Sequence, residues 1–551
     1  MKRALAMALG AMMVAGSAAP ATAASHIDFS GYYRVNYMLD VNRGMESEAG
    51  SFTDHYFDDR LLINMTFSPT DEIAVHWQLR GPNRERWGAG TRAGNLVTQH
   101  VYGEIKQDWG TVLVGRLDNG LDVYGLASLG YQPGFGPYQN YGPFDRADVI
   151  DAVRYTNRWD NGFGLMVQYA KMEAGGYSDY TRTYTDSTGD TVVLPAGTHA
   201  NKSSDEDADR VQAEVSYMWD GGGASLGLMY DRNATGGYHG TSAAYVDRLN
   251  NVYLHDKTTA FFVNPAIMHS WGNFSVHFEG MAGWGSTDAY NRGLGKSRSA
   301  DADGYGAYLD FDYNYGPGNV NLAGWWVSGS DLGDRDSGSL VDLVGGNFYP
   351  LLVAYGYTGN GAWRIDLNNN EGSRKAINAI GVANNAFENF IAPNLGAGST
   401  FLDTGNVMPA ALATQSVTRF VGTTFNEGTD ANHWAVSLSG NHAFTDDITM
   451  HYAVAYLALN NPNYRVVDSW DGTTAKMKEQ DKDLGFEVDL GFQFQLLDNL
   501  SFTSSFGYMF TGDAYKELRG YNENTATGLS KAKWRDGDDT YVWYNTLQFD
   551  F

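Results

Sequence analysis

The sequence predicts an all-β protein, a transmembrane antiparallel β-barrel of about 18 strands, with about 16 strands as the alternative count. Three observations support this prediction. Beyond residue 26, many segments alternate between apolar and polar residues. Short and long connections follow one another along the chain. No segment reaches the ~18 consecutive apolar residues that a membrane helix requires.

The stretch 27–40 shows the alternation most clearly. One face carries Ile27, Phe29, Tyr33, Val35, Tyr37 and Leu39, and the other carries Asp28, Ser30, Tyr32, Arg34, Asn36 and Asp40. A shift of one residue would place Arg34 in lipid, at a cost of about 2–4 kcal/mol near the bilayer midplane. The register is therefore well specified, and the same pattern recurs at 60–67, 73–80 and 484–495.

The connections predict which end of the barrel faces which compartment. Short turns are expected at 69–71, 107–110, 158–162, 220–223, 315–318, 444–447 and 496–499. Long polar loops are expected at 40–57, 81–96, 118–150, 174–209, 233–258, 287–302, 329–431, 459–482 and 512–539. Outer-membrane barrels have short periplasmic turns and long extracellular loops, so both ends of the chain should lie in the periplasm.

A soluble β-sandwich or propeller is the alternative fold. The sequence shows no blade-like repeat of about 40–50 residues. Its strands are long and end on aromatic residues, which suits a membrane better.

Residues 1–23 have the pattern of a secretory signal peptide, with Lys2 and Arg3 before a short apolar stretch and Ala21-Thr22-Ala23 at the cleavage site. Residues 24–551 then form a single transmembrane β-barrel domain. Cysteine is absent, which excludes disulfides and thiolate metal sites. The net charge of −26 argues against nucleic acid as a partner.

Two stretches resemble the homotrimeric general porins of Gram-negative bacteria. Trp109-Gly110-Thr111-Val112-Leu113-Val114-Gly115-Arg116 is similar to the strand before the constriction loop of these porins. Asp151-Ala152-Val153-Arg154-Tyr155-Thr156-Asn157, followed by Asn161-Gly162-Phe163-Gly164-Leu165, is similar to the strand and turn after it. Phe551, with Phe549 and Leu547 alternating behind it, resembles the signal that the barrel-assembly machinery recognises.

The resemblance covers the first third of the chain and the last strand. More narrowly, the chain is placed near the homotrimeric porins of sulfate-reducing bacteria. The expected strand number and the long external loop near 329–431 depart from the general porins.

The resemblance also implies that the third long loop, near 118–150, folds into the barrel and narrows it. This loop carries Asp118, Asp122, Asp145 and Asp148, which are the predicted acidic side of the constriction. The predicted basic side is a set of five inward arginines: Arg34, Arg60, Arg80, Arg116 and Arg154. Acids facing arginines across a narrow aqueous gap would create a transverse field that favours dipolar solutes. Alternatively, the arginines only solvate a polar lumen and brace its wall.

Strand alternation places further side chains inside the barrel. The expected inward acids are Glu104, Glu214, Glu279, Asp310, Asp312, Glu487 and Asp489, and they indicate mild cation preference. The inward aromatics Tyr32, Tyr308, Trp325 and Tyr544 could form a track for sugars, but packing is the favoured interpretation.

Other possible sites have weak support. Asp205, Asp207 and Asp209 lie in an acidic stretch that could bind Ca²⁺, although a solvated charge run is the favoured interpretation. No other metal site and no cofactor site is expected. The histidines form no H-E-x-x-H motif, and no Ser/His/Asn or Asp/His set indicates an outer-membrane phospholipase or protease.

These features predict an outer-membrane porin that lets ions and small hydrophilic solutes diffuse passively. A channel selective for saccharides or organic acids is the first alternative, and a surface adhesin or structural barrel is the second. The expected partners are outer-membrane lipids and lipopolysaccharide, two further copies in a homotrimer, the barrel-assembly machinery and small hydrophilic solutes.

Overall fold

A computed structural model of the chain describes most of the strands and part of the loops. The described residues are 26–41, 53–83, 87, 96–118, 149–173, 182–185, 191–194, 208–233, 244–246, 252–291, 296–329, 341, 351–354, 432–461, 464–466, 477–479, 481–515, 519–525, 528–535 and 539–551. The predicted signal peptide lies outside them. Within these ranges, no helix has the length and apolar character needed to cross a membrane.

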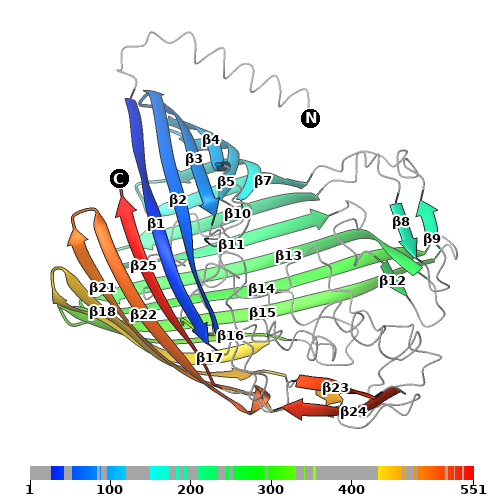
Figure 1. The fold of residues 1–551 in the computed structure, drawn as a ribbon. Coiled ribbons are helices and arrows are strands. Elements are labelled where there is room, and N and C mark those ends of the chain that lie inside the picture. Colours follow the sequence, from blue (N-terminus) through cyan, green and yellow to red (C-terminus); the bar gives the residue numbers. More distant parts are fainter. Residues whose placement is uncertain are drawn as a thin grey trace.

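Antiparallel strands form nearly all of the described structure (Figure 1). The first nine strands of the wall are β1 His26–Val41, β2 Thr53–Thr70, β3 Ile73–Asn83, β4 Val97–Gln107, β5 Gly110–Asp118, β6 Val149–Arg158, β7 Phe163–Glu173, β10 Ala208–Trp219 and β11 Gly222–Asn233. The other nine are β13 Val252–Trp271, β14 Phe274–Asn291, β15 Lys296–Asn314, β16 Gly318–Val327, β17 His433–Thr445, β18 Ile448–Leu459, β21 Asp483–Leu497, β22 Leu500–Thr511 and β25 Thr540–Asp550.

These strands close into a barrel. The main sheet has 19 strands, of which β12 (Ala244–Val246) pairs only with β13, so 18 form the wall. Each strand pairs with its neighbours along the chain, and β1 pairs with β25 from Tyr32↔Asp550 to Val41↔Tyr541. The count of 18 strands is therefore confirmed, and the alternative of 16 is wrong.

Phe551, the last residue, stabilises the closure between β25 and β1. Phe551 and Gly31 exchange two backbone hydrogen bonds of 2.8 and 3.0 Å. The Phe551 ring stacks on Phe29 at 5.7 Å, and it passes so close to Gly31 that a Cβ there would lie 2.9 Å from the ring. A Cβ at position 31 would also overlap the backbone carbonyl oxygen of Leu62 in β2, so glycine is needed there.

Short elements lie outside the barrel wall. Three two-stranded sheets pair β8 (Arg182–Thr185) with β9 (Thr191–Leu194), β19 (Tyr464–Val466) with β20 (Met477–Glu479), and β23 (Arg519–Thr525) with β24 (Gly528–Arg535). A 3₁₀ turn, η3, spans Asp513–Tyr515. All of these belong to connections at the end opposite the short turns.

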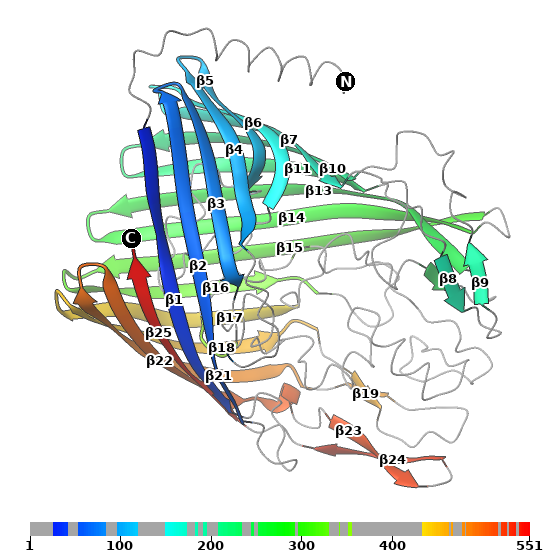
Figure 2. The same ribbon diagram turned by 45° about the horizontal axis from the view of Figure 1, so that its top comes forward.

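The predicted alternation of short and long connections is confirmed, with two corrections. A short turn at 272–273 was missed, although Gly272-Asn273 between two alternating segments is a turn signal. The predicted loop 287–302 is mostly strand, because β14 continues to Asn291 and β15 begins at Lys296. As a result β13, β14 and β15 extend well past β3–β7 (Figures 1 and 2).

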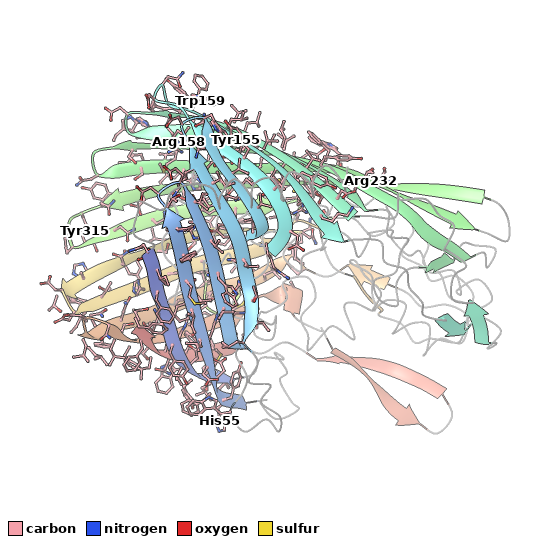
Figure 3. The ribbon with its side chains drawn as sticks, turned by 90° about the horizontal axis from the view of Figure 1, so that it is seen from above. His55, Tyr155, Arg158, Trp159, Arg232 and Tyr315 are labelled. Carbon is pink, nitrogen blue, oxygen red and sulfur yellow. The ribbon has the colours of Figure 1, made fainter. Side chains whose placement is uncertain are left out.

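The outer face is apolar along the middle of the strands and aromatic towards both ends. Exposed aliphatic residues of the middle are Val101, Val167, Val215, Leu226, Leu322, Leu438 and Leu490. Near the short turns the aromatics include Trp109 against Tyr155, Trp271 against Phe274, and Phe494 against Phe502. Near the loops they include Phe57 against Trp87, Phe261 against Trp284, and Phe506 against Tyr541. Figure 3 shows Tyr155, Trp159 and Tyr315 beside the short turns.

An apolar band between two aromatic girdles on a closed barrel is the surface of a protein that spans an outer membrane. The predicted location in the bacterial outer membrane is therefore confirmed.

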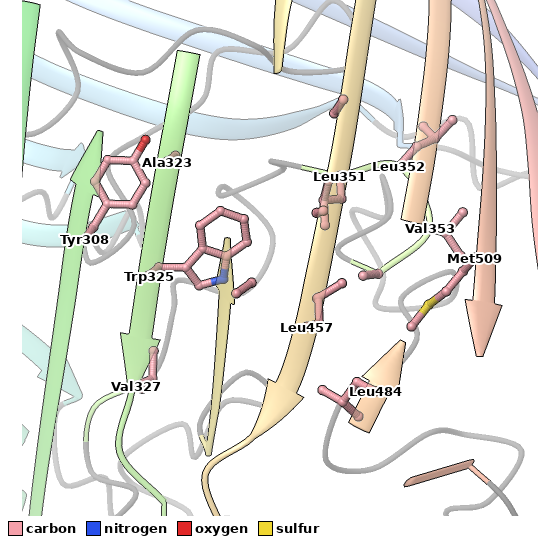
Figure 4. Close-up of a cluster of buried hydrophobic side chains, with 14 of the residues drawn as sticks. Tyr308, Ala323, Trp325, Val327, Leu351, Leu352, Val353, Leu457, Leu484 and Met509 are labelled. Atoms are coloured by element: carbon pink, nitrogen blue, oxygen red, sulfur yellow. The ribbon is translucent and has the colours of Figure 1, made fainter. Parts of the chain in front are cut away.

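The largest cluster of buried apolar side chains lies inside the barrel. It contains inward residues of strands from β11 to β25, among them Phe262, Tyr308, Trp325 and Met509, and it also contains Leu351–Ala354. Tyr308, Trp325 and Tyr544 thus pack in this cluster, as the favoured interpretation predicts. Figure 4 shows Leu351, Leu352 and Val353 among the strand residues Leu457, Leu484 and Met509.

Candidate functional site in the barrel lumen

Three of the predicted arginines lie on neighbouring strands and face the lumen. Arg34 of β1 is opposite Arg60 of β2 in the strand register, and Arg80 of β3 is opposite Leu62, the next inward position of β2. Arg34 is buried, whereas Arg60 and Arg80 are half-buried. Like charges on adjacent positions repel unless other groups compensate them.

Polar neighbours surround Arg34. Its guanidinium carbon lies 4.5 Å from the centre of the Tyr32 ring, a cation–π contact. Two residues along β1, Asn36 donates to Asp58 of β2 at 2.5 Å, and Asn36 accepts from Tyr544 at 2.7 Å. Asp58 therefore places a buried carboxylate on the same face as Arg34 and Arg60.

Arg154 is also inward and buried, and it begins a chain of side chains across three strands. Its Nε donates to Gln168 of β7 at 2.6 Å. Gln168 in turn donates to Gln212 of β10. Arg34, Arg60, Arg80 and Arg154 thus face the lumen, and their role in a constriction stays a prediction.

The prediction for Arg116 is wrong. Arg116 is exposed and lies opposite Val101 of β4 and Asp151 of β6, both of which face outward. Leu113 and Leu117 take the inward positions of β5. Arg116 is tolerated outside because it lies two residues from the loop end of β5, where the membrane interface can solvate it.

An inward arginine that the sequence analysis missed is Arg210 of β10. It binds Asp231 of β11 with two hydrogen bonds, Nε to Oδ1 at 2.6 Å and Nη2 to Oδ2 at 2.7 Å. Both side chains are buried. Alternation with the outward Val211 and Val215, which placed Glu214 inside, could also have placed Arg210 inside.

The predicted acidic loop is not part of the described residues. Asp122, Asp145 and Asp148 lie outside the described ranges, and Asp118 is the last residue of β5, with an undescribed side chain. Whether they form a constriction stays a prediction. The seven acids that alternation placed inside do face the lumen, and Glu214, Glu279, Asp310, Glu487 and Asp489 are almost fully buried.

The inward acids of β14 and β15 bind residues of neighbouring strands. Asp310 of β15 lies 3.2 Å from His277 of β14, and Glu279 accepts from Asn264 of β13 at 3.0 Å. On β4, the Glu104 carboxylate lies 2.6 Å from Nε2 of His76 and 3.0 Å from Nζ of Lys106. Glu104 and Lys106 line a polar pocket of about 440 Å³ at the short-turn end of β2–β4.

Glu487 and Asp489 of β21 bind the backbone of a distant segment instead. The amide of Leu352 donates to Asp489 at 3.0 Å, and those of Val353 and Ala354 donate to Glu487 at 2.5 and 2.8 Å. We call Leu351–Ala354 the lumen segment. It belongs to the stretch 329–431, which was predicted as an external loop. That prediction is wrong for these four residues, because they lie inside the barrel. The remaining residues between 330 and 431, apart from Val341, lie outside the described ranges. The apolar run Leu-Leu-Val-Ala in a polar stretch was the available signal.

The possible Ca²⁺ site gains no support from Asp209. Its carboxylate binds Lys171 at 2.8 Å and the Tyr169 hydroxyl at 2.7 Å. Asp205 and Asp207 lie outside the described ranges, and the described part of the chain holds no group of three acidic or histidine side chains suited to a metal ion.

Solved structures similar to this chain are outer-membrane proteins. OccAB1 of Acinetobacter baumannii is 12% identical over 95% of this chain and 96% of its own, with a TM-score of 0.41. OccK5 (OpdH) of Pseudomonas aeruginosa is 9% identical over 95% and 98%, with a TM-score of 0.40. An anion-selective porin from Comamonas acidovorans is 12% identical over 96% and 100%, with a TM-score of 0.37. No protein-family model matches the chain, and no curated protein is similar in sequence.

Proposed function

We propose that the protein is an outer-membrane porin, a water-filled channel through which ions and small hydrophilic solutes diffuse passively. A barrel of this strand number encloses more space than its wall side chains fill. The observation that carries the proposal is the inner face, which presents charged side chains of both signs on β1–β3, β6, β10, β14, β15 and β21. A wall of this kind is stable only next to water or to compensating partners.

Mild cation preference follows from the balance of inward charges. The inward acids of the described strands are Asp58, Glu104, Glu214, Asp231, Glu279, Asp310, Asp312, Glu487 and Asp489. The inward cations are Arg34, Arg60, Arg80, Lys106, Arg154 and Arg210. The acids are more numerous, and the chain as a whole is strongly acidic.

Planar-bilayer recording of the purified protein tests the proposal. We expect stepwise conductance and, in a KCl gradient, a reversal potential on the cation-selective side. Swelling of liposomes in sugars of increasing size measures the exclusion limit. A protein that inserts but does not conduct would leave the surface adhesin or structural barrel as its function.

A channel selective for organic acids is the second candidate, and one observation favours it. Arg34, Arg60 and Arg80 form a row of guanidinium groups on adjacent strands, and arginine binds carboxylates through paired hydrogen bonds. Such a channel would saturate with a dicarboxylate and conduct less chloride in its presence. A general porin would show neither effect.

The remaining expectations concern processing and partners. We infer that residues 1–23 are removed on export, that lipids and lipopolysaccharide surround the apolar band, and that the barrel assembles as a homotrimer. Leu547 and Phe549 of β25 and the following Phe551 are exposed, which supports the proposal that the barrel-assembly machinery recognises them. We propose a channel without enzymatic activity. Mass measurement in detergent and deletion of Phe551 test the trimer and the assembly signal.

A further inference from the structure

The lumen segment is held by two independent kinds of contact. Three successive amides, those of Leu352, Val353 and Ala354, donate to Glu487 and Asp489. All four side chains of the segment are at least 95% buried and belong to the large internal cluster. A carboxylate that accepts two or three amide hydrogen bonds fixes a backbone more strongly than a neutral acceptor would.

The wall beneath the segment is built of small residues. The strand register aligns Ala323 of β16, Ser437 of β17, Ala455 of β18 and Glu487 of β21 across four adjacent strands. The next inward row contains Asn321, Ser439, Ala453 and Asp489. Because these side chains are short, the inner wall between the acids of β15 and those of β21 leaves room for an additional chain segment.

Gly507 of β22 extends this part of the inner wall by one strand. It lies opposite Asp489 in the register, and a Cβ on it would overlap Oδ1 of Asp489 and would lie 2.9 Å from Cγ2 of Val353 and 3.0 Å from Cβ of Leu352. The segment therefore touches the wall backbone directly. Any larger side chain at position 507 competes with the segment for the same space.

We propose that the lumen segment is a constriction element of this channel and that Glu487, Asp489 and Gly507 are the wall residues that position it. This inference rests on the proposed pore. It places a narrowing at the β16–β17 connection, which is distinct from the predicted loop near 118–150.

The docking also changes the charge that a permeating ion meets. With the segment in place, both carboxylates are buried, and both oxygens of Glu487 and Oδ2 of Asp489 accept hydrogen bonds from its amides. When the segment leaves, two negative charges become accessible to the lumen. Undocking therefore widens the channel and increases its cation preference together.

Gly507→Val provides the sharpest test, because it adds volume to the wall and should nevertheless widen the pore. Single-channel conductance should rise by at least about 1.5-fold, with a more cation-selective reversal potential. Ser505→Leu is the matched control, since it adds volume on the same inward face of β22 without opposing Asp489. It should leave conductance unchanged or reduce it. Heat-modifiable migration in gels shows that each barrel has folded.

The double variant Glu487→Gln/Asp489→Asn separates positioning from simple charge. If the two carboxylates only attract cations, the variant lowers potassium conductance. If they hold the lumen segment, conductance rises, as for Gly507→Val. Wild-type protein that conducts while neither variant conducts more overturns the constriction. Wild-type protein that never conducts overturns the pore itself.

Discussion

Strands β1–β10 and strands β11–β25 line the same lumen with different chemistry. The first group carries the five buried or half-buried inward arginines Arg34, Arg60, Arg80, Arg154 and Arg210. The second carries most of the buried inward acids, namely Asp231, Glu279, Asp310, Glu487 and Asp489, and most of the internal apolar cluster, whereas the first carries the buried acids Asp58 and Glu214. The arginine half interacts mainly through neighbouring wall side chains, whereas part of the acidic half is covered by the chain's own backbone. Within the described strands, charge and occlusion are thus distributed around the circumference of the barrel.

The largest expected effect is at the boundary between the two halves, where Arg210 meets Asp231. Replacing only Arg210 with Met leaves a buried carboxylate without its partner, which costs about 3–5 kcal/mol of folding free energy. The double variant Arg210→Met/Asp231→Leu should recover most of this loss. Urea unfolding in lipid vesicles, followed by tryptophan fluorescence, measures both. Equal losses for the single and double variants would contradict the pairing.

Removing the charge of the arginine half should change selectivity more than stability. In Arg34→Gln/Arg60→Gln/Arg80→Gln the cation-to-anion permeability ratio should increase by at least about threefold, because the local potential becomes more negative. Arg116→Gln is the control, since Arg116 faces outward. A reversal potential that does not change in the triple variant would mean that these arginines only brace the wall.

Salt concentration sharpens the same comparison. The Debye length falls from about 30 Å at 0.01 M to about 3 Å at 1 M ionic strength. The selectivity difference between wild type and the triple arginine variant should therefore shrink strongly at 1 M KCl. The conductance gain of Gly507→Val should persist, since it has a steric origin. A gain that also disappears at high salt would assign it to charge instead.

The smallest expected effect is on the hydrogen bonds around Asn36. Tyr544→Phe removes the 2.7 Å bond from the hydroxyl to Asn36 and should cost about 0.5–1.5 kcal/mol. Selectivity should not change, because no charge is removed. Tyr313→Phe, on the exposed outer face, is the control and should be close to neutral in the same unfolding measurement.

Alternation along the chain was sufficient to predict the barrel and most inward side chains. Arg34 and Glu487 were placed correctly because their apolar neighbours must face lipid, which leaves one possible register. Arg116 was predicted to face the lumen because it is charged, although the alternation along β5 indicates the opposite. Val112 and Val114 face outward, and Arg116 lies on the same face.

The lumen segment could not be predicted, because it depends on tertiary contacts. Leu352 and Asp489 are separated by 137 residues, and nothing local indicates that they meet. Gly507 in a strand is compatible with a bulge, a kink or a close approach, and only the structure shows that Leu352 and Val353 lie against it.

The unequal strand lengths give the mouth of the barrel a high side and a low side. β13 has 20 residues, β14 has 18 and β15 has 19, and β1 and β2 have 16 and 18, whereas β4 to β7 have 9 to 11. A tilted strand needs only about 9–11 residues to cross the bilayer. Roughly half of each of the strands β13–β15 therefore extends beyond the lipid. A large molecule that approaches the cell surface contacts these strand ends before it reaches the channel entrance.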